Sequence, residues 1–182
     1  MDTKLFEFIH SLGFPIGKKG SEIIIPNIFY EKDLMKYIAQ GFIATDGSLV
    51  LTKNPNKYYP RIEAHAICKN VLKQLHGYFE SLGMKGCFYK CKRLKKEAWA
   101  RRDMYRFQFN GNKNLQIFNQ CIGFVNPAYK MKFEKFLKYE QEYSLITRGL
   151  ASFKVKDLIK NINSNFASTM AAPRFELGTP AL

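Results

Sequence analysis

The order of periodic segments along the chain constrains its fold more than any other feature of the sequence. Twice, a segment with the apolar spacing of a helix is followed by a pair of segments that alternate between apolar and polar residues. The helical segments cover residues 31–45 and 70–82, and the alternating segments cover 48–54, 58–67, 86–94 and 104–109. Turn residues such as Asn54-Pro55-Asn56-Lys57 separate the first pair, which is typical of a hairpin.

Further helical segments precede and follow this repeated unit. They cover residues 3–12, 115–121, 128–143 and 153–162. The pattern therefore predicts an α+β domain with an antiparallel four-stranded sheet that helices cover on one face. We expect an N-terminal helix and linker (1–28), the main domain (29–145), a C-terminal helix (146–163) and a disordered or appended tail (164–182).

The charge of the chain indicates which partner it attracts. The 182 residues carry a formal charge of +14, and residues 48–102 alone hold 13 Lys and Arg against 3 Glu, a net +10. Such a localised excess favours nucleic acid as the partner. The N-terminal residues include acids and resemble neither a secretory leader nor an import peptide, and no apolar run has the roughly 18–20 residues of a membrane span. We expect an intracellular, cytoplasmic protein without a membrane partner.

The four cysteines have two interpretations. Cys87 and Cys91, together with His65 and Cys68, are a set from which a zinc site of mixed ligands is built in other proteins. Their spacing matches no compact zinc motif, and the chain shows no secretory leader that would indicate disulfides. Reduced thiols, with Cys87 and Cys91 as small buried hydrophobic residues on one face of a strand, are the favoured interpretation.

The face of the sheet that helices leave open is predicted to be polar and basic. Alternation places on it, strand by strand, Val50, Thr52 and Asn54; Arg61, Glu63 and His65; Lys90 and Lys92; Arg106 and Gln108. Asn56 joins them from the first hairpin turn. Arg and Lys suit guanine, Gln and Asn suit adenine, Glu suits the cytosine amine, and an apolar residue suits the thymine methyl group. These are the candidate DNA-binding residues, although a polar face is also what any half-exposed sheet shows.

A single carboxylate stands where the helix of residues 31–45 meets the first strand. The helix ends in small residues, Gly41, Ala44 and Thr45, and Asp46-Gly47 follows directly. Small residues allow a second helix to approach closely, and two Asp46 carboxylates brought together repel unless a cation lies beside them. Mg²⁺ takes few protein carboxylates and fills its remaining positions with water and phosphate oxygens, which suits phosphodiester hydrolysis. Asp-Gly after a helix is also a common turn.

Residues 39–47, Ala-Gln-Gly-Phe-Ile-Ala-Thr-Asp-Gly, resemble the LAGLIDADG motif of homing endonucleases, and their surroundings agree. The matching segments are Ile24–Pro26 before the motif and Tyr59–Glu63, Phe107–Gly111 and Ile122–Pro127 after it. The similarity covers about residues 13–140 in the family's order. It implies an αββαββα core whose saddle-shaped sheet grips the DNA major groove, and a metal-dependent endonuclease that makes double-strand breaks. Asp46 takes the role of the catalytic metal ligand, with the Thr45 carbonyl as a further ligand and Mg²⁺, or Mn²⁺ as a substitute, as the metal.

The motif occurs once, so the resemblance implies a homodimer on a pseudo-palindromic DNA site, with Gly41, Ala44 and Thr45 at the interface. Where family members often carry Gln or Lys to organise the hydrolytic water, this chain has His65-Ala66-Ile67-Cys68. Two alternatives stay open: a nucleic-acid binder that does not cleave, such as an intron maturase acting on RNA or a regulator, and an inactive half of a two-motif enzyme.

Overall fold

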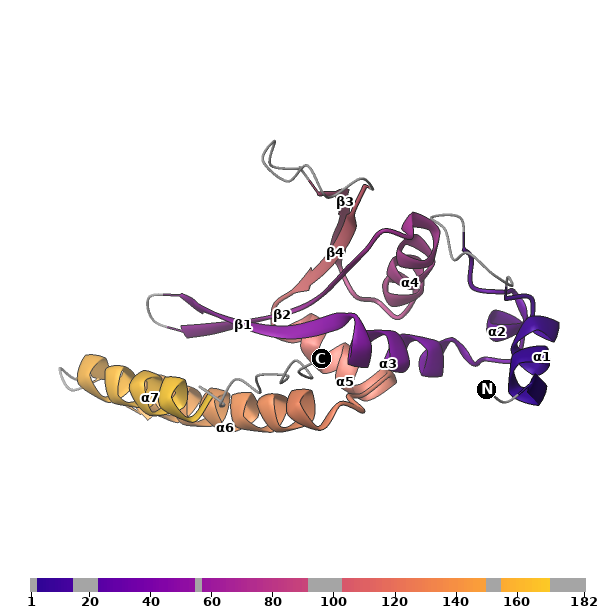
Figure 1. The fold of residues 1–182 in the computed structure, drawn as a ribbon. Helices are drawn as coiled ribbons and strands as arrows, with labels where there is room; N and C mark the ends of the chain where they lie inside the picture. Colours follow the sequence, from indigo (N-terminus) through magenta and orange to yellow (C-terminus); the bar gives the residue numbers. More distant parts are fainter. Residues whose placement is uncertain (1–2, 15–22, 55–56, 92–102, 150–154, 171–182) are drawn as a thin grey trace, which may run out of the picture. The chain divides into compact units, whose positions relative to one another are not determined.

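The computed structural model describes residues 3–14, 23–54, 57–91, 103–149 and 155–170, which form helices and one sheet (Figure 1). The elements are α1 (Thr3–Ser11), α2 (Ile28–Glu31), α3 (Met35–Thr45), β1 (Gly47–Asn54), β2 (Lys57–Ala66), α4 (Lys69–Ser81), β3 (Gly86–Lys90), β4 (Tyr105–Asn110), α5 (Asn112–Cys121), α6 (Pro127–Gly149) and α7 (Val155–Met170). From α3 to α5 the order is αββαββα. This order confirms the predicted α+β class.

The four strands form one sheet in the order β1-β2-β4-β3. β4 pairs in antiparallel fashion with β2 on one side and with β3 on the other. Each hairpin therefore keeps its two strands as neighbours, and the hairpins join through β2 and β4. The predicted antiparallel four-stranded sheet is confirmed.

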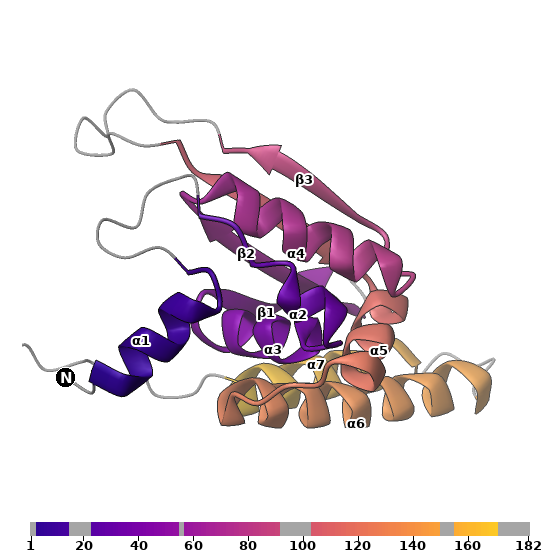
Figure 2. The ribbon, with the colours of Figure 1, turned by 90° about the vertical axis from the view of Figure 1, so that its right-hand side faces the viewer.

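One face of this sheet packs against helices, and Figure 2 shows α4 lying along the strands. Leu72, Leu75 and Phe79 recur at helical spacing on α4 and are fully buried. The Phe79 ring lies 5.5 Å from Phe107 and 5.4 Å from Phe109 of β4, in edge-to-face geometry. Burial of each such side chain contributes about 1.5–3 kcal/mol to folding, so the covered face is the core that holds the sheet in place.

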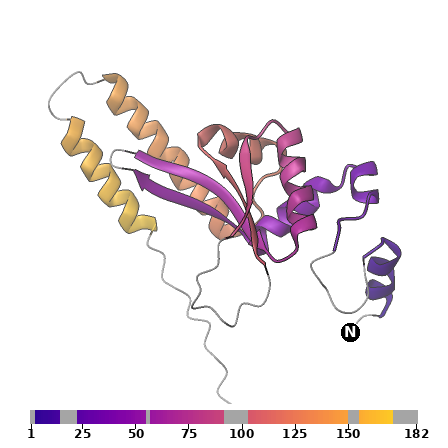
Figure 3. The same cartoon turned by 90° about the horizontal axis from the view of Figure 1, so that it is seen from above.

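By their contacts the residues divide into two units. The first comprises Met1–Asn54 and Tyr58–Lys130, with the whole sheet core, and the second comprises Pro55–Lys57 and Met131–Leu182. In the second unit α6 and α7 lie side by side (Figure 3), and the rings of Tyr139 and Phe166 are 5.1 Å apart. Within the described ranges, no helix combines the length and the apolar character of a membrane span.

The helix predicted from residue 31 to residue 45 is interrupted. α2 ends at Glu31 and α3 begins only at Met35. Between them Asp33 adopts φ +53°, a left-handed conformation that Asp tolerates better than most residues. The Leu34 amide donates to the Phe29 carbonyl at 2.8 Å, which closes the first helix and starts the second in a new direction.

The C-terminal helix is longer than predicted. A disordered or appended tail was predicted from residue 164; α7 continues to Met170, so residues 164–170 are helical, and whether they are appended stays a prediction. Asn163 and Phe166, three residues apart on one helix face, are both buried, and their packing overrides the weak periodicity of the Ala, Ser and Thr residues. Residues 171–182 lie outside the described residues. The predicted domain boundaries at 28/29 and 145/146 stay predictions.

Candidate nucleic-acid interface and acidic site

Asp46 stands at the end of α3, as its C-cap residue, and its side chain is exposed. The Thr45 hydroxyl lies 2.9 Å from Asp46 Oδ2 and 3.1 Å from the Gly41 carbonyl oxygen. A hydroxyl carries one proton, so it donates to one of these acceptors at a time. The carboxylate thus projects from a helix C-terminus, where unpaired carbonyls already favour a cation.

Two side chains from the start of α6 hold the backbone on either side of Thr45 and Asp46. Asn126 Nδ2 donates to the Ala44 carbonyl at 3.0 Å, and the Tyr129 hydroxyl donates to the Gly47 carbonyl at 2.7 Å. Asn126 Oδ1 also accepts from the Ala128 amide, which caps α6. Burial raises the pKa of the Tyr129 hydroxyl, so it keeps its proton as a donor at neutral pH. The position of Asp46 is therefore fixed by its neighbours' backbone.

Gly47 is required by the turn from α3 into β1. A Cβ at this position would lie 2.7 Å from Ile43 Cα and 2.9 Å from the Ile43 carbonyl oxygen. Both are backbone atoms of the helix itself, so neither moves easily. The Asp-Gly pair is thus more than an ordinary turn, because its glycine lets the strand leave directly from the helix end.

One face of α3 is open along most of its length. Tyr37, Gly41 and Thr45, spaced four residues apart, are all exposed, with Tyr37 at 62%. A Cβ built on Gly41 meets nothing within 4 Å. Glycine inside a helix costs about 1 kcal/mol relative to alanine, so Gly41 weakens α3 without any steric need among the described residues. Ala44, the third residue predicted at the interface, is half-buried.

The residues at this helix end suit a hard divalent cation. Such ions take carboxylate and carbonyl oxygens, which are the groups that Asp46 and the end of α3 provide. Among the described residues, no three His, Cys, Asp or Glu side chains gather closely enough to hold a metal within one chain.

The strand register defines the open face of the sheet. Directly opposed residues point to the same side, and the opposed pairs are Arg61 with Asn110, Glu63 with Gln108, and His65 with Arg106. The neighbours Ile62 and Ala64 are opposed to Phe109 and Phe107, in the core. The predicted common face of Arg61, Glu63, His65, Arg106 and Gln108 is confirmed as geometry; their contact with DNA is a proposal.

For β3, the predicted face is wrong. Tyr89 is opposed to Arg106 and Cys87 to Gln108, so these two residues lie on the open face and are exposed. Lys90 instead is opposed to Tyr105 on the side of Phe88, and its Nζ lies 2.5 Å from Asp103 Oδ2. Phe88 has the same parity as Lys90 and is the most apolar residue of the strand. Giving it more weight would have predicted the correct face, with Tyr89 on the open side.

The remaining candidates are placed in part. In β1, Val50 is half-buried and Thr52 is exposed, while Leu49 is buried on the opposite side, as alternation predicts. Asn54 is the last residue of that strand. Asn56 and Lys92 lie outside the described residues.

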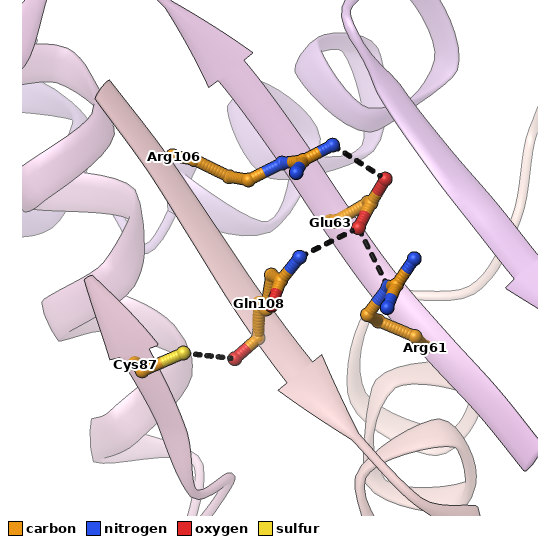
Figure 4. A network of polar contacts seen from close by, with 5 residues as sticks. All are labelled: Arg61, Glu63, Cys87, Arg106 and Gln108. Carbon is orange, nitrogen blue, oxygen red and sulfur yellow. Dashed lines mark hydrogen bonds and ion pairs between the residues drawn. The ribbon is translucent and has the colours of Figure 1, made fainter. Parts of the chain in front are cut away.

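At the centre of the open face, the polar side chains bind one another (Figure 4). Glu63 is only 7% exposed, and it forms ion pairs with Arg61, Nε to Oε2 at 2.6 Å, and with Arg106, Nη2 to Oε1 at 3.1 Å. Gln108 Nε2 donates to Oε2 at 3.0 Å. Glu63 therefore lies beneath its neighbours, and it does not stand free to accept from a cytosine amine as predicted.

Comparison with solved structures adds one finding. The structural neighbours of this chain are LAGLIDADG homing endonucleases. I-GzeII in complex with its DNA target is 18% identical, over 75% of this chain and 44% of that chain, with a TM-score of 0.47. I-CvuI in complex with the I-CreI target, in the presence of Mg and with the DNA not cleaved, is 15% identical over 79% of this chain and 98% of that chain (TM-score 0.41). I-CvuI in complex with its own target, in the presence of Ca, is 15% identical over 77% of this chain and 96% of that chain (TM-score 0.36).

No protein-family model and no curated protein matches the chain. The TM-scores of these three structures are 0.36 to 0.47 and their identities are 15–18%. A function for this chain therefore rests on its own residues. The chain spans less than half of I-GzeII.

Proposed function

We propose that this chain is a sequence-specific DNA endonuclease of the LAGLIDADG type, which makes metal-dependent double-strand breaks in a long pseudo-palindromic site as a homodimer. Mg²⁺ is the proposed cofactor, with Mn²⁺ as a substitute, and double-stranded DNA is the substrate. The observation that carries the proposal is the exposed Asp46 carboxylate, held in place at the end of a helix whose open face has Gly41 at its middle.

The open face of α3 supports the dimer. Gly41 has no steric role within the part of the chain that the structure describes, and small residues at such a position let a second helix approach closely. A two-fold axis at this face brings two copies of Asp46 together, each preceded by Thr45 at the end of its own helix. One chain then supplies half of the metal ligands, which is why Asp46 and the Thr45 carbonyl are proposed as a partial set.

The open face of the sheet supports binding in the DNA major groove. Arg61, His65, Arg106 and Gln108 share that face, and Thr52 is exposed on β1. An antiparallel ribbon fits the major groove, and these side chain types match the donor and acceptor pattern of base edges. The overall charge of +14 gives the long-range attraction to phosphates. Asn54, Asn56, Val50 and Lys92 extend the proposed contact surface.

The residues of this chain would contribute to the reaction by holding the metal and the DNA in position. A bound divalent metal would activate water and stabilise the leaving oxygen of the phosphodiester. Asp46 would hold that metal, and Asn126 and Tyr129 would keep Asp46 at a fixed position by binding the carbonyls of Ala44 and Gly47. The sheet face would set which phosphodiester is presented to the metal.

The first test is cleavage by the purified chain. A duplex is selected from a random-sequence pool with Ca²⁺, and it is then incubated with Mg²⁺ or with chelator. We expect a double-strand break at one position with Mg²⁺ only, and loss of cleavage by about 10³-fold or more in Asp46→Asn, because a metal ligand stabilises the transition state by several kcal/mol. Binding to the duplex should change by less than threefold.

Asp33→Asn is the matched control. Asp33 is exposed, lies outside the proposed site, and has a left-handed backbone that Asn adopts equally well. It should cleave like the wild-type chain. A wild-type chain that selects a duplex but never cuts it would overturn the endonuclease proposal in favour of a non-cleaving binder, and preferred binding to an RNA would identify a maturase. Sedimentation at micromolar concentration tests the dimer, and a monomer without specific binding would indicate an inactive half.

A further inference from the structure

Among the described residues, Glu63 is the one charged side chain that is buried. A carboxylate removed from water is costly unless ion pairs and hydrogen bonds replace its hydration. Here three partners on two strands do so: Arg61 of the same strand forms an ion pair, and Arg106 and Gln108 of β4 donate hydrogen bonds. Arg106 in turn forms a side-chain hydrogen bond with Tyr89 of β3.

The two arginines are more exposed than Glu63. The Arg61 and Arg106 side chains are 29% and 33% exposed, whereas the Glu63 side chain is 9% exposed. Glu63 uses Nε of Arg61 and one terminal nitrogen of Arg106, and each guanidinium carries five N–H donors in a rigid plane. Fixing one edge of a guanidinium fixes the direction of the others. Figure 4 shows Arg61, Arg106 and Gln108 converging on Glu63.

We propose that Glu63 is a specificity-determining positioning residue: it does not contact a base itself, but it orients Arg61, Arg106 and Gln108 on the open sheet face so that they read base edges. This inference rests on the proposed DNA-binding function. Arg donors held in one direction can pair bidentately with guanine O6 and N7, and Gln108 with adenine. The same guanidinium groups released from Glu63 would turn to the nearest phosphates, which carry no sequence information.

Burial alone would lower the pKa of Arg106, but its hydrogen bond with Tyr89 and the charge of Glu63 together raise that pKa. Arg106 is therefore positively charged at every accessible pH. The cluster of Arg61, Glu63 and Arg106 has a net charge of +1 where two free arginines would have +2. Glu63 thereby reduces the attraction to arbitrary DNA at the same place where it orders the donors.

The test compares Glu63→Gln with the matched charge control Glu31→Gln, since Glu31 is exposed on α2 and both changes remove one negative charge. The probes are a duplex that the wild-type chain selects from a random pool and an unrelated duplex of equal length. Fluorescence anisotropy at several salt concentrations gives both dissociation constants, without requiring cleavage. Each bidentate base contact contributes roughly 5- to 150-fold of discrimination.

We expect Glu63→Gln to lower the ratio of specific to unrelated affinity by about tenfold or more. It should also steepen the salt dependence on the unrelated duplex by about one unit of slope, as one more arginine contacts phosphate. Glu31→Gln should leave both quantities unchanged. In an Arg106→Ala background, the fall caused by Glu63→Gln should shrink, because one of the residues it positions is gone.

Glu63→Asp keeps the charge but shortens the side chain by one methylene, so it should lower the specificity ratio with little change in salt slope. Glu63→Asp also replaces Glu63→Gln as the test variant if circular dichroism shows that Glu63→Gln does not fold. A wild-type chain that selects a sequence while Glu63→Asp and Glu63→Gln keep its specificity ratio would overturn this inference alone. A wild-type chain that selects no sequence would overturn the proposed function, and this inference with it.

Discussion

The end of α3 and the open face of the sheet are both polar sites, but they are held in opposite ways. At the helix end, the side chain of interest, Asp46, is exposed, and the neighbouring backbone is fixed by Asn126 and Tyr129. On the sheet, the backbone is fixed by the strand ladder, and the side chains are fixed by Glu63 beneath them. The first arrangement suits one reaction at one point. The second suits graded recognition along a surface.

The largest effect on folding is expected at Gly47. Gly47→Ala places a Cβ 2.7 Å from Ile43 Cα, so the junction of α3 and β1 must shift. We expect the free energy of unfolding to fall by about 3 kcal/mol, as in an overpacked core. Urea denaturation measures it.

Gly77→Ala is the control for this prediction, because Gly77 lies on α4 with open space around its Cβ position. It should gain up to about 1 kcal/mol. If the free energy of unfolding of Gly47→Ala lies within about 1 kcal/mol of the wild-type value, the helix end relaxes easily. Its backbone would then not be rigidly held, and the contrast with the sheet face would be lost.

A smaller effect is expected at Asn126. Asn126→Ala removes the donor to the Ala44 carbonyl and the cap of α6, which together should cost about 1–2 kcal/mol of stability. If Asn126 also holds Asp46 in place, cleavage should fall by about tenfold or more while DNA binding stays within threefold.

Asn126→Ser separates the two roles. Serine caps helices well but does not reach the Ala44 carbonyl, so stability should recover in part while cleavage stays low. Single-turnover cleavage at saturating DNA, alongside urea denaturation, makes the comparison. Recovery of cleavage together with stability would show that Asn126 acts on the fold alone.

The sequence was sufficient for the fold because its signals were redundant. Leu72, Leu75 and Phe79 show the period of a helix, and Phe107 and Phe109 that of a strand, so element type and order were predictable. Asp46 was singled out because a helix pattern, small residues and Asp-Gly coincide with a resemblance to the LAGLIDADG motif, and its role stays a proposal. The prediction of which β3 residues lie on the open face was wrong because this five-residue strand, with Tyr89 and Lys90 in succession, alternates only weakly. Its pairing with β4 decides the face.

Contacts between segments far apart in the chain could not be predicted from the sequence. Asn126 and Tyr129 lie 82 positions from the carbonyls they bind, and nothing local marks them as partners of α3. Glu63 was predicted on the correct face, but its burial was not predicted, because alternation shows which face a side chain is on and not how deeply it is buried. Its burial depends on two ion pairs and a hydrogen bond from Gln108, contributed by two strands.

Tyr129 gives a further comparison, with an effect of about 1 kcal/mol. Tyr129→Phe leaves the Gly47 carbonyl without its donor, which is the ordinary cost of one lost hydrogen bond. Because burial raises the pKa of Tyr129 in the folded chain, the wild-type chain keeps this contribution below the unfolded pKa near 10.0 and loses it as the pH rises toward the higher folded value.

The measurement is urea denaturation at about pH 8 and about pH 10.5, on either side of the ordinary tyrosine pKa. The loss of stability between the two should be smaller in Tyr129→Phe than in the wild-type chain. Tyr58→Phe is a control of the same kind at a tyrosine outside the helix end, whose pKa burial also raises. Equal losses in the wild-type chain and in Tyr129→Phe would show that this hydroxyl does not titrate with unfolding.

The smallest effect on stability, and the most informative for the dimer, is expected at Gly41. Gly41→Ala and Gly77→Ala both place a methyl group in open space on a helix, so each should gain about 0.5–1 kcal/mol in the monomer. They should differ in association: Gly41→Ala separates the proposed helix pair and weakens the dimer by about tenfold or more, as for an overpacked contact, whereas Gly77→Ala leaves it unchanged. Sedimentation equilibrium measures both. Equal dimer dissociation constants for the two variants would show that α3 does not form the dimer interface. Gly41 would then weaken its helix for no reason that the fold provides.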